Sequence, residues 1–159
     1  MGKYQSIRWS INHLKKQHEL RTEPLCAENL SVARSMLARW QPCSGTDLYS
    51  ADHATADLML SNMTTLDITG IIVYVDGEAA ALAAGFPLSE RSFDIAFSKA
   101  PERETGLLHY ARRMLVSSLP EQYTIINGEE DLGIPGLRQA KRLEHPMGQI
   151  EMWEAYAEE

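Results

Sequence analysis

The residues with the clearest capacity for chemistry lie in a charged loop between a strand pattern and a helix pattern. Residues 93–98 alternate between large apolar and small or polar side chains, which is typical of a half-buried strand. The loop 99–106 follows with Arg103 and Gly106, and an amphipathic helix begins directly after it. Because the first amides of a helix lack partners within the helix, this loop is a candidate anion-binding site. The alternative is an ordinary strand–loop–helix connection.

Other common catalytic and metal-binding patterns are missing from the sequence. Cys26 and Cys43 form no CxxC pair and have no suitably spaced histidines, so we interpret both as reduced structural thiols. No Gly-x-Ser-x-Gly elbow supports a serine nucleophile, and nothing near His53 completes a metal set. We therefore expect no metal and no required cofactor.

Length and composition suit one globular domain with a proper core, or half of a larger protein. The chain has 159 residues, of which 44% are hydrophobic and 23% charged, and its formal net charge is -7. That charge argues against general nucleic-acid binding, although basic side chains gather locally near the N-terminus and after residue 111. The sequence has no apolar run of about 18 residues and no secretory signal at its start. We therefore expect a cytoplasmic protein without a transmembrane segment.

Hydrophobic periodicity predicts where the helices lie. A leading amphipathic helix is predicted over residues 3–18, and its basic outer face serves either a phosphate or partner, or only solvent. Pro42 ends the next predicted helix. The remaining helices are predicted over residues 27–41, 52–65 and about 105–118, with one more beginning at Pro135.

Alternating and β-branched runs predict about six strands. They cover residues 20–26, 70–75, 78–86, 93–98, 123–126 and 149–156. Pro24 makes the first an edge strand, and Asp76-Gly77 predicts a two-residue hairpin turn between the second and third. The fifth strand follows a helix, so we expect it to pair in parallel with the preceding meander.

After the first helix, this order of elements resembles the acetyltransferase-like (GNAT) fold. The resemblance implies an α+β domain with a mixed, mostly antiparallel sheet of about six strands and helices on both faces. In that fold the pyrophosphate of the acyl donor binds the loop after the fourth strand. The corresponding loop in this chain is 99–106.

Three segments carry a more specific resemblance. They are GIIVYVDGEAAALAAGFPLSERSFDIAFSKA, the loop 103–106 and YTIINGEEDLGIPGLRQAKRLEHP. They resemble an acyltransferase-like family related to the C-terminal domain of phosphatidylglycerol lysyltransferases, most strongly over residues 68–146. The run Asn-x-Glu-Glu-Asp-Leu-Gly-Ile-x-Gly-Leu-Arg-x-Ala-Lys is its most specific part. The family implies that residues 1–159 form one GNAT-like domain, led by the helix within 1–18, like the C-terminal unit of a tandem protein.

The resemblance also implies a donor and a donor site. The donor is expected to be acyl-CoA or aminoacyl-tRNA, and the acceptor an amine or a hydroxyl. Donor phosphates are expected to bind Arg103, Thr105, Gly106 and Leu107, through the guanidinium and the amides of the loop.

Acyl transfer further needs a group that removes a proton from the acceptor. Glu129 and Glu130 follow the fifth predicted strand, so either is a candidate catalytic base, with solvated loop carboxylates as the alternative. Ser98, Asn127 and Asp131 are expected to lie on the acceptor side or to shape the loop.

Four positions depart from the family's pattern. Leu108 stands where the phosphate loop of GNAT proteins has a small residue, which would crowd a pyrophosphate. The family often has Arg at the position of Gly128, Tyr at that of Glu144 and Glu at that of Ser98. These losses favour a second hypothesis, a catalytically degenerate unit that serves ligand binding, dimerisation or pairing with a second GNAT-like unit. The retained loop 103–106 favours an acyltransferase.

Overall fold

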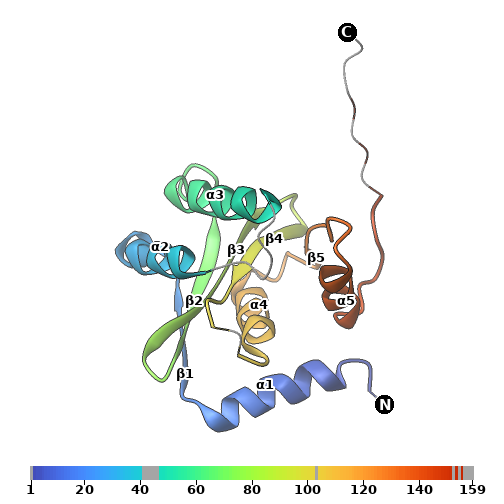
Figure 1. Cartoon of the computed structure of the whole chain (residues 1–159). Helices are drawn as coiled ribbons and strands as arrows, with labels where there is room; N and C mark the ends of the chain where they lie inside the picture. Colours follow the sequence, from blue (N-terminus) through green and yellow to red (C-terminus); the bar gives the residue numbers. More distant parts are fainter. Residues whose placement is uncertain (1, 41–46, 103, 152, 154, 156–159) are drawn as a thin grey trace.

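A five-stranded sheet separates two layers of helices (Figure 1). The computed structural model describes residues 2–40, 47–102, 104–151, 153 and 155, with the backbone alone for residues 47–51. The strands are β1 (Leu20–Pro24), β2 (Thr69–Val75), β3 (Glu78–Pro87), β4 (Ser92–Lys99) and β5 (Ile125–Asn127). The helices are α1 (Gln5–Gln17), α2 (Leu30–Arg39) after the short 3-10 helix η1 (Ala27–Asn29), α3 (Asp47–Ser61), α4 (Leu107–Ser118) and α5 (Pro135–Leu143).

The strands lie in the sheet in the order in which they occur in the chain. β1 to β4 pair antiparallel and β5 pairs with β4 in parallel, which confirms the predicted mixed, mostly antiparallel sheet. β1 is an edge strand, as Pro24 predicted. The Asp76-Gly77 turn is also confirmed, because Val75 pairs with Glu78 and both turn residues have positive φ, 51° and 89°.

The predicted sixth strand is wrong for the residues described in the segment 149–156. The structure describes 149–151, 153 and 155 there, and none of them is in a strand. The segment leads away from the sheet (Figure 1), and Ile150 and Trp153 are 87% and 82% exposed. A strand needs a neighbour to satisfy its backbone groups, and propensity alone does not supply one.

Two apolar cores form on the two faces of the sheet. α1 and α4 supply Ile11, Leu14, Leu107 and Leu115 to one core, and α2 and α3 supply a second core on the opposite face. The small residues of β3 alternate between these cores, so α4 and α2 both pack closely on this strand. The sheet is therefore buried on both faces.

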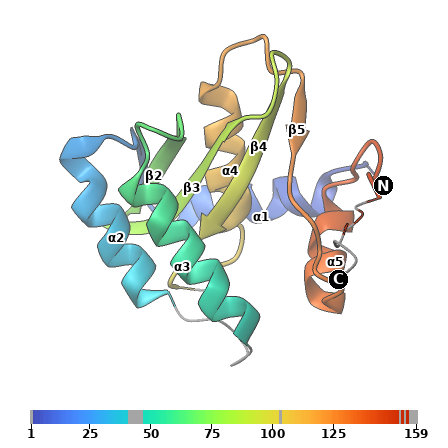
Figure 2. The ribbon, with the colours of Figure 1, turned by 90° about the horizontal axis from the view of Figure 1, so that it is seen from above.

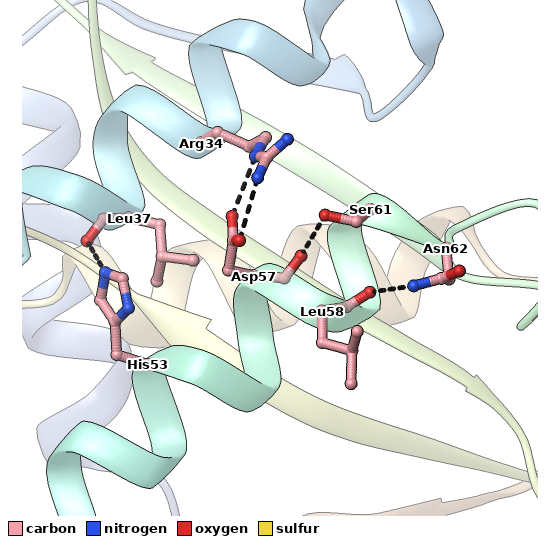
Figure 3. Close-up of polar contacts among 7 residues, drawn as sticks. All are labelled: Arg34, Leu37, His53, Asp57, Leu58, Ser61 and Asn62. Carbon is pink, nitrogen blue, oxygen red and sulfur yellow. Dashed lines mark hydrogen bonds and ion pairs between the residues drawn. The ribbon is translucent and has the colours of Figure 1, made fainter.

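Polar contacts join α2 and α3, the two helices that supply the second core (Figure 3). Arg34 donates two hydrogen bonds to Asp57, each 2.9 Å long, and His53 Nε2 lies 3.1 Å from the carbonyl oxygen of Leu37. α3 begins at Asp47, before the predicted start at residue 52, so His53 lies in the second turn rather than at the helix start. The predicted end at residue 65 is also wrong. The helix ends at Ser61, and Asn62 just after it donates both its backbone N–H and its side-chain amide to the carbonyl of Leu58.

Candidate functional site

The candidate site begins where β4 and β5 separate. The parallel ladder pairs Ser92 with Ile125 and ends at Asp94 with Asn127, whereas β4 continues to Lys99. Figure 2 shows β5 beside the first half of β4 and the chain then turning away toward α5. Along residues 95–99, no strand pairs with this edge of β4 in the parts of the chain that the structure describes. Its backbone groups are therefore available to an extended ligand.

A β-bulge lies at the same point of β4. Ala84 pairs with Phe97 and Phe86 pairs with Asp94, so Gly85 alone opposes two residues of β4. A Cβ atom on Gly85 would lie 1.7 Å from the carbonyl oxygen of Asp94, so only glycine permits this approach. The bulge leaves one residue of β4 out of the ladder and changes the direction of the strand where the separation begins.

Three polar side chains meet at the separation. Asp94 is 1% exposed, and its Oδ1 accepts a hydrogen bond of 2.6 Å from the Asn127 amide. Glu129 follows two residues after Asn127, and its carboxyl lies near enough to Asp94 for Asp94 to raise its pKa. The backbone of Glu129 has φ of 65°, a left-handed conformation that is uncommon for a residue with a Cβ and is found at functional sites. Much of Glu129 is open to solvent, whereas Asp94 is sealed within the sheet.

The Glu129 carboxyl titrates near neutral pH in this environment. Burial of the carboxyl end raises its pKa most, and the hydrogen bond and the charge of Asp94 raise it further. The charge of Lys141 opposes these effects, and the resulting pKa is about 7, against 4.5 for a free glutamate. A carboxyl with this pKa exchanges protons at physiological pH, as a general acid or base must.

Cations from α4 and α5 surround the loop that carries Glu129. Lys141 on α5 donates to the carbonyl oxygen of Gly128. The pKa of Lys141 is lowered, first by burial and then by the charge of Arg112. Arg112 on α4 pairs with Glu144 at 2.8 Å. Burial acts to raise the pKa of Glu144, but its contacts with His109 and Arg112 outweigh burial and lower it. Arg112 Nη2 lies 3.0 Å from where a Cβ on Gly128 would be. Arg112 of α4 therefore supplies a cation beside Gly128, the position at which the family often has Arg.

The loop between β4 and α4 is fixed by the elements around it. Gly106 is the N-cap of α4, with φ of 88°, and a Cβ there would lie 2.5 Å from the backbone oxygen of Ser10 on α1. Leu107 is buried in the core, and its amide donates to the carbonyl oxygen of Glu104 at 3.2 Å, whereas Leu108 is 40% exposed at the surface. Thr105 is exposed, and Arg103 lies outside the described residues.

A histidine joins this loop to the β2–β3 turn. His18 Nδ1 lies 2.6 Å from Asp76 Oδ2, and its Nε2 lies 3.0 Å from Glu104 Oε1. Only the protonated ring donates from both nitrogens. The hydrogen bond with Asp76 raises the pKa of His18 above 6.5, more than burial lowers it. His18 therefore anchors the loop most strongly when it is charged.

We expect this anchor to depend on pH. Because the folded-state pKa of His18 is raised, its contribution is fully present below about pH 6.5 and is lost as the pH rises through the raised value. The difference in Tm between the protein and a His18→Gln variant should shrink as the pH rises from about 5.5 to 9. His13→Gln is the control, because that ring stacks on Trp9. A constant difference for His18→Gln would contradict the expectation.

The structure brings together some of the residues expected from the sequence. Asn127 and Glu129 meet at the separation of the strands, while Glu130 is exposed beside them. Asp131 accepts from the amide of Gly133 at 2.9 Å and pairs with Arg138, which holds its pKa at about 2. Asp131 therefore bonds within its own loop and to Arg138 on α5.

The other end of β4 carries a second group of contacts. Ser98 is half-buried opposite Ala83 on β3. The neighbouring Lys99 is 7% exposed, pairs with Asp52 and lies 4.1 Å from the centre of the Trp40 ring. These contacts fix the strand end from which the loop 100–106 begins.

Sequence reasoning missed Asp94, and with it the partner of Glu129. The only signal available was a carboxylate between Phe93 and Ile95 in a strand that proves to be covered on both faces. Lys141 and Arg112 were visible as members of basic clusters, but the sequence does not show that both approach Gly128.

Surface hollows do not mark this site. Two shallow hollows, of about 430 and 400 Å³, lie on the outer side of α1 and beside α2 at the start of β3. Both are open depressions, and neither is lined by residues at the separation of β4 and β5. Among the described residues, no three His, Cys, Asp or Glu side chains are placed to hold a metal ion. None of the described helices is both long and apolar enough to cross a membrane.

Comparison with known proteins gives one family match and several structural ones. A family model described as "Phosphatidylglycerol lysyltransferase, C-terminal" matches residues 2–156. No curated protein sequence matches the chain. In structure, the chain is similar to a conserved protein of unknown function from Bacteroides thetaiotaomicron VPI-5482, with 28% sequence identity and a TM-score of 0.87. That match covers 93% of this chain and 51% of the other, so the chain spans about half of the other's length.

More distant structural matches are acetyltransferases. One is a ribosomal-protein-alanine N-acetyltransferase from Brucella melitensis biovar Abortus 2308, with a TM-score of 0.59 and 13% identity over 89% of this chain and 99% of that one. Another is the aminoglycoside acetyltransferase AAC(6')-Iy in complex with a CoA-based bisubstrate analogue, with a TM-score of 0.58 and 12% identity over 89% and 99%. At these identities the similarity shows the fold alone. The chain has a GNAT fold and belongs to the family of the C-terminal domain of phosphatidylglycerol lysyltransferases.

Proposed function

We propose that this chain transfers an acyl or aminoacyl group from a donor bound along β4 to an amine or hydroxyl acceptor. One observation carries the proposal. The free edge of β4 runs from the N-terminal end of α4 to a carboxyl, Glu129, whose pKa is about 7. The five residue-to-residue steps of strand from Asp94 to Lys99 span about 16 Å. This length suits a donor with an anionic group at one end and a reactive carbonyl at the other.

The anionic end of the donor would bind the loop before α4. Arg103 would contribute its guanidinium, and the amides of Thr105 and Gly106 would contribute donors at the helix start. The amide of Leu107 would join them by exchanging its bond to the Glu104 carbonyl for one to the donor. The extended middle of the donor would pair with the free backbone groups of β4, in the manner of an added strand. Its carbonyl would then lie near the bulge, where the ladder leaves a residue of β4 unpaired.

Glu129 would move the proton in this reaction. The acceptor nitrogen or oxygen forms a bond to the donor's carbonyl carbon, and its proton passes to the Glu129 carboxylate. The bond from that carbon to the donor's sulfur or oxygen breaks, and the leaving atom takes the proton from Glu129. The reaction therefore produces an amide or ester and a free thiol or hydroxyl, with no net change in protons.

The donor is acyl-CoA or aminoacyl-tRNA. The similarity to an acetyltransferase bound to a CoA-based analogue supports the first, and the family name supports an aminoacyl group such as lysyl. Because both donors are cytoplasmic compounds, we propose that the chain acts in the cytoplasm. The basic residues of α1 and its flank, Lys3, Arg8, Lys15 and Lys16, offer a local surface for tRNA despite the net charge of -7.

One observation favours a second candidate function. The chain spans about half of its relative from Bacteroides thetaiotaomicron, which suggests a unit that pairs with a second GNAT-like unit or with a copy of itself. In that case the chain would bind a ligand or a partner without turnover. Donor binding together with turnover would exclude this function.

Donor binding is expected to raise the thermal stability of the chain. A ligand at a hundredfold excess over its Kd adds about 2.7 kcal/mol, or roughly 5–10 °C in Tm for a domain of this size. The measurement is a thermal-shift screen with acetyl-CoA, CoA and charged tRNA. Arg103→Ala should abolish the shift, whereas Arg113→Ala, which removes an exposed cation of α4, should retain it. No shift with any donor would refute the proposed function.

A further inference from the structure

The first helix carries a tryptophan on the side that faces solvent. α1 packs on the core through Ile11 and Leu14, whereas Trp9 is 62% exposed. Figure 1 shows α1 at the outer edge of the molecule, beside α4. Single exposed apolar side chains are common, so Trp9 indicates a binding surface only if its surroundings do as well.

The indole of Trp9 is supported on one side and borders a hollow on another. The His13 ring stacks on it, with the ring centres 5.0 Å apart and the ring planes at 9°. The hollow, of about 430 Å³, is lined by Gly2, Gln5, Arg8, Trp9 and Asn12. His13 does not line it, so the hollow and the stacked ring lie on different sides of the indole. This position suits a second flat ring that stacks on Trp9.

The cations beside this hollow are available to an anion. Residues 1–18 contain four of the 15 Lys and Arg residues of the chain and none of its 22 Asp and Glu residues. Arg8 and Lys16 form no ion pair within the part of the chain that the structure describes. Arg8 Nη2 lies 3.2 Å from where a Cβ on Gly2 would be, at the border of the hollow. Lys16 follows Trp9 by two helical turns, which places it on the same face about 10 Å further along.

We propose that this outer face of α1 binds single-stranded RNA, with a base stacked on Trp9 and phosphates paired with Arg8 and Lys16. Exposed aromatic rings combined with cations along the backbone are the means by which proteins bind unpaired nucleic acid. The side-chain amides of Gln5 and Asn12 border the same hollow and both donate and accept hydrogen bonds, which suits base edges and the ribose 2′-hydroxyl. An RNA duplex keeps its bases stacked on one another, so only an unpaired segment offers a base to Trp9.

A membrane surface and a protein surface fit this face less well. Binding in a membrane interface needs a broad apolar helix face, but Ile7, Ile11 and Leu14 of α1 pack against the core. The centre of a protein–protein interface is depleted of charge and of Lys, whereas Arg8 and Lys16 lie on the same helix surface as Trp9. Charge and ring together therefore favour a nucleic acid.

The position of α1 connects this face with the proposed donor site. Gly106 of the loop before α4 packs against the backbone of Ser10, and His18 Nε2 lies 3.0 Å from Glu104 Oε1 of the same loop. An unpaired RNA end that carries an acyl group, such as the 3′ end of aminoacyl-tRNA, would meet α1 beside this loop. RNA binding is a property of α1, and only the identification of the RNA with the donor rests on the proposed function.

Fluorescence anisotropy of a short, fluorescein-labelled oligoadenylate tests the stacking in the intact chain. Trp9→Ala should weaken binding about 5–150-fold, the effect of one lost base stack, whereas Trp9→Phe keeps a ring and should lose less. Trp9 belongs to neither core, so we expect both variants to fold. Trp153→Ala is the matched control, because that side chain is 82% exposed in the C-terminal segment, and its affinity should be unchanged.

The salt dependence of the same binding tests the phosphate contacts. Lys16→Gln should reduce the slope of log Kd against log salt concentration by about 0.7, the value for one phosphate contact with a single strand. Arg34→Gln is the control, because it removes a cation from α2, on the opposite face of the sheet, and its slope should be unchanged.

Several results would overturn the inference. They are no binding of the oligoadenylate at low salt, equal weakening in Trp9→Ala and Trp153→Ala, and equally tight binding of an RNA duplex that Trp9→Ala leaves unchanged. Binding of phosphatidylglycerol vesicles, or a dimer in size-exclusion chromatography, that depends on Trp9 in place of RNA binding would overturn it as well.

The outcomes also separate this inference from the proposed function. RNA binding that depends on Trp9, without turnover of any donor, supports the RNA-binding face and refutes the proposed function. Turnover of acyl-CoA by a chain that binds no RNA supports the proposed function and refutes the RNA-binding face.

Discussion

Replacing Glu129 by glutamine is expected to lower kcat for acyl transfer about 10²–10³-fold while leaving donor affinity within about twofold. The glutamine side chain keeps the size of the glutamate and loses the site that takes up the proton. The donor contacts proposed along β4 and the loop before α4 do not involve this carboxyl, so the loss should appear in kcat. The measurement is steady-state kinetics with the donor identified by the thermal-shift screen.

The pH dependence should identify Glu129 as the group that titrates. A base acts when it is deprotonated, so kcat/KM of the unmodified protein should rise with pH through about 7. That rise should be absent in Glu129→Gln. Glu130→Gln is the matched control, because its carboxylate is exposed in the same loop, and its activity should stay within about threefold. Activity retained in Glu129→Gln and lost in Glu130→Gln would assign the role to Glu130.

The stability of the same variant should change in the opposite direction to its activity. The folded state raises the pKa of Glu129 from 4.5 to about 7, so between these values it holds a proton that the unfolded chain has lost, and its stability falls as the pH rises across this interval. Glutamine stays neutral and avoids this penalty. The Tm of Glu129→Gln should therefore rise relative to that of the unmodified protein as the pH increases from about 4.5 to about 7, and the difference should stay constant at higher pH. A residue retained at such a cost to stability is consistent with a functional role.

The order of the elements was readable from the sequence because local physical chemistry decides it. Alternation over 93–98, the Asp76-Gly77 turn and the proline at 24 each specify a conformation over a few residues, and the structure has a meander with these features. The parallel pairing of β5 followed from the helix that precedes it. The predicted strand over 149–156 failed because pairing depends on a neighbouring strand, which propensity does not reveal.

The chemistry of the site was only half readable, because it depends on burial and on contacts between distant segments. Glu129 was selected because it follows a strand. Its pKa, however, is raised first by burial and then by Asp94, which lies 35 positions earlier in the sequence. The alternation of apolar and polar residues over 93–98 placed Asp94 on the polar side of β4, which implied that its side chain is exposed. In the structure, helices cover both faces of the sheet, so this side is buried as well. Nor does the sequence show that Arg112 approaches Gly128, since that contact needs α4 and the loop after β5 to be packed together.

Replacing Gly85 by alanine is expected to give the largest loss of stability of any glycine-to-alanine change among the residues that the structure describes. The new Cβ would lie 1.7 Å from the carbonyl oxygen of Asp94 and 2.8 Å from the ring of Phe93. The nearest atom belongs to the backbone of a central strand, so no rotation of a side chain relieves the contact. β3 and β4 must separate at the bulge, at a cost of about 4 kcal/mol or more, against a total of roughly 5–15 kcal/mol for a domain.

Gly136→Ala is the matched control for this substitution. Gly136 lies in α5, and a Cβ there would meet no atom within 4 Å. Alanine is the better helix former, so this variant should be unchanged or stabilised by up to about 1 kcal/mol. Urea denaturation of both variants measures the difference, and a soluble but unfolded Gly85→Ala chain also meets the expectation. A Gly85→Ala variant as stable as the unmodified protein would show that β3 and β4 do not approach at the bulge. Asp94 would then lose the support that keeps it buried beside Glu129.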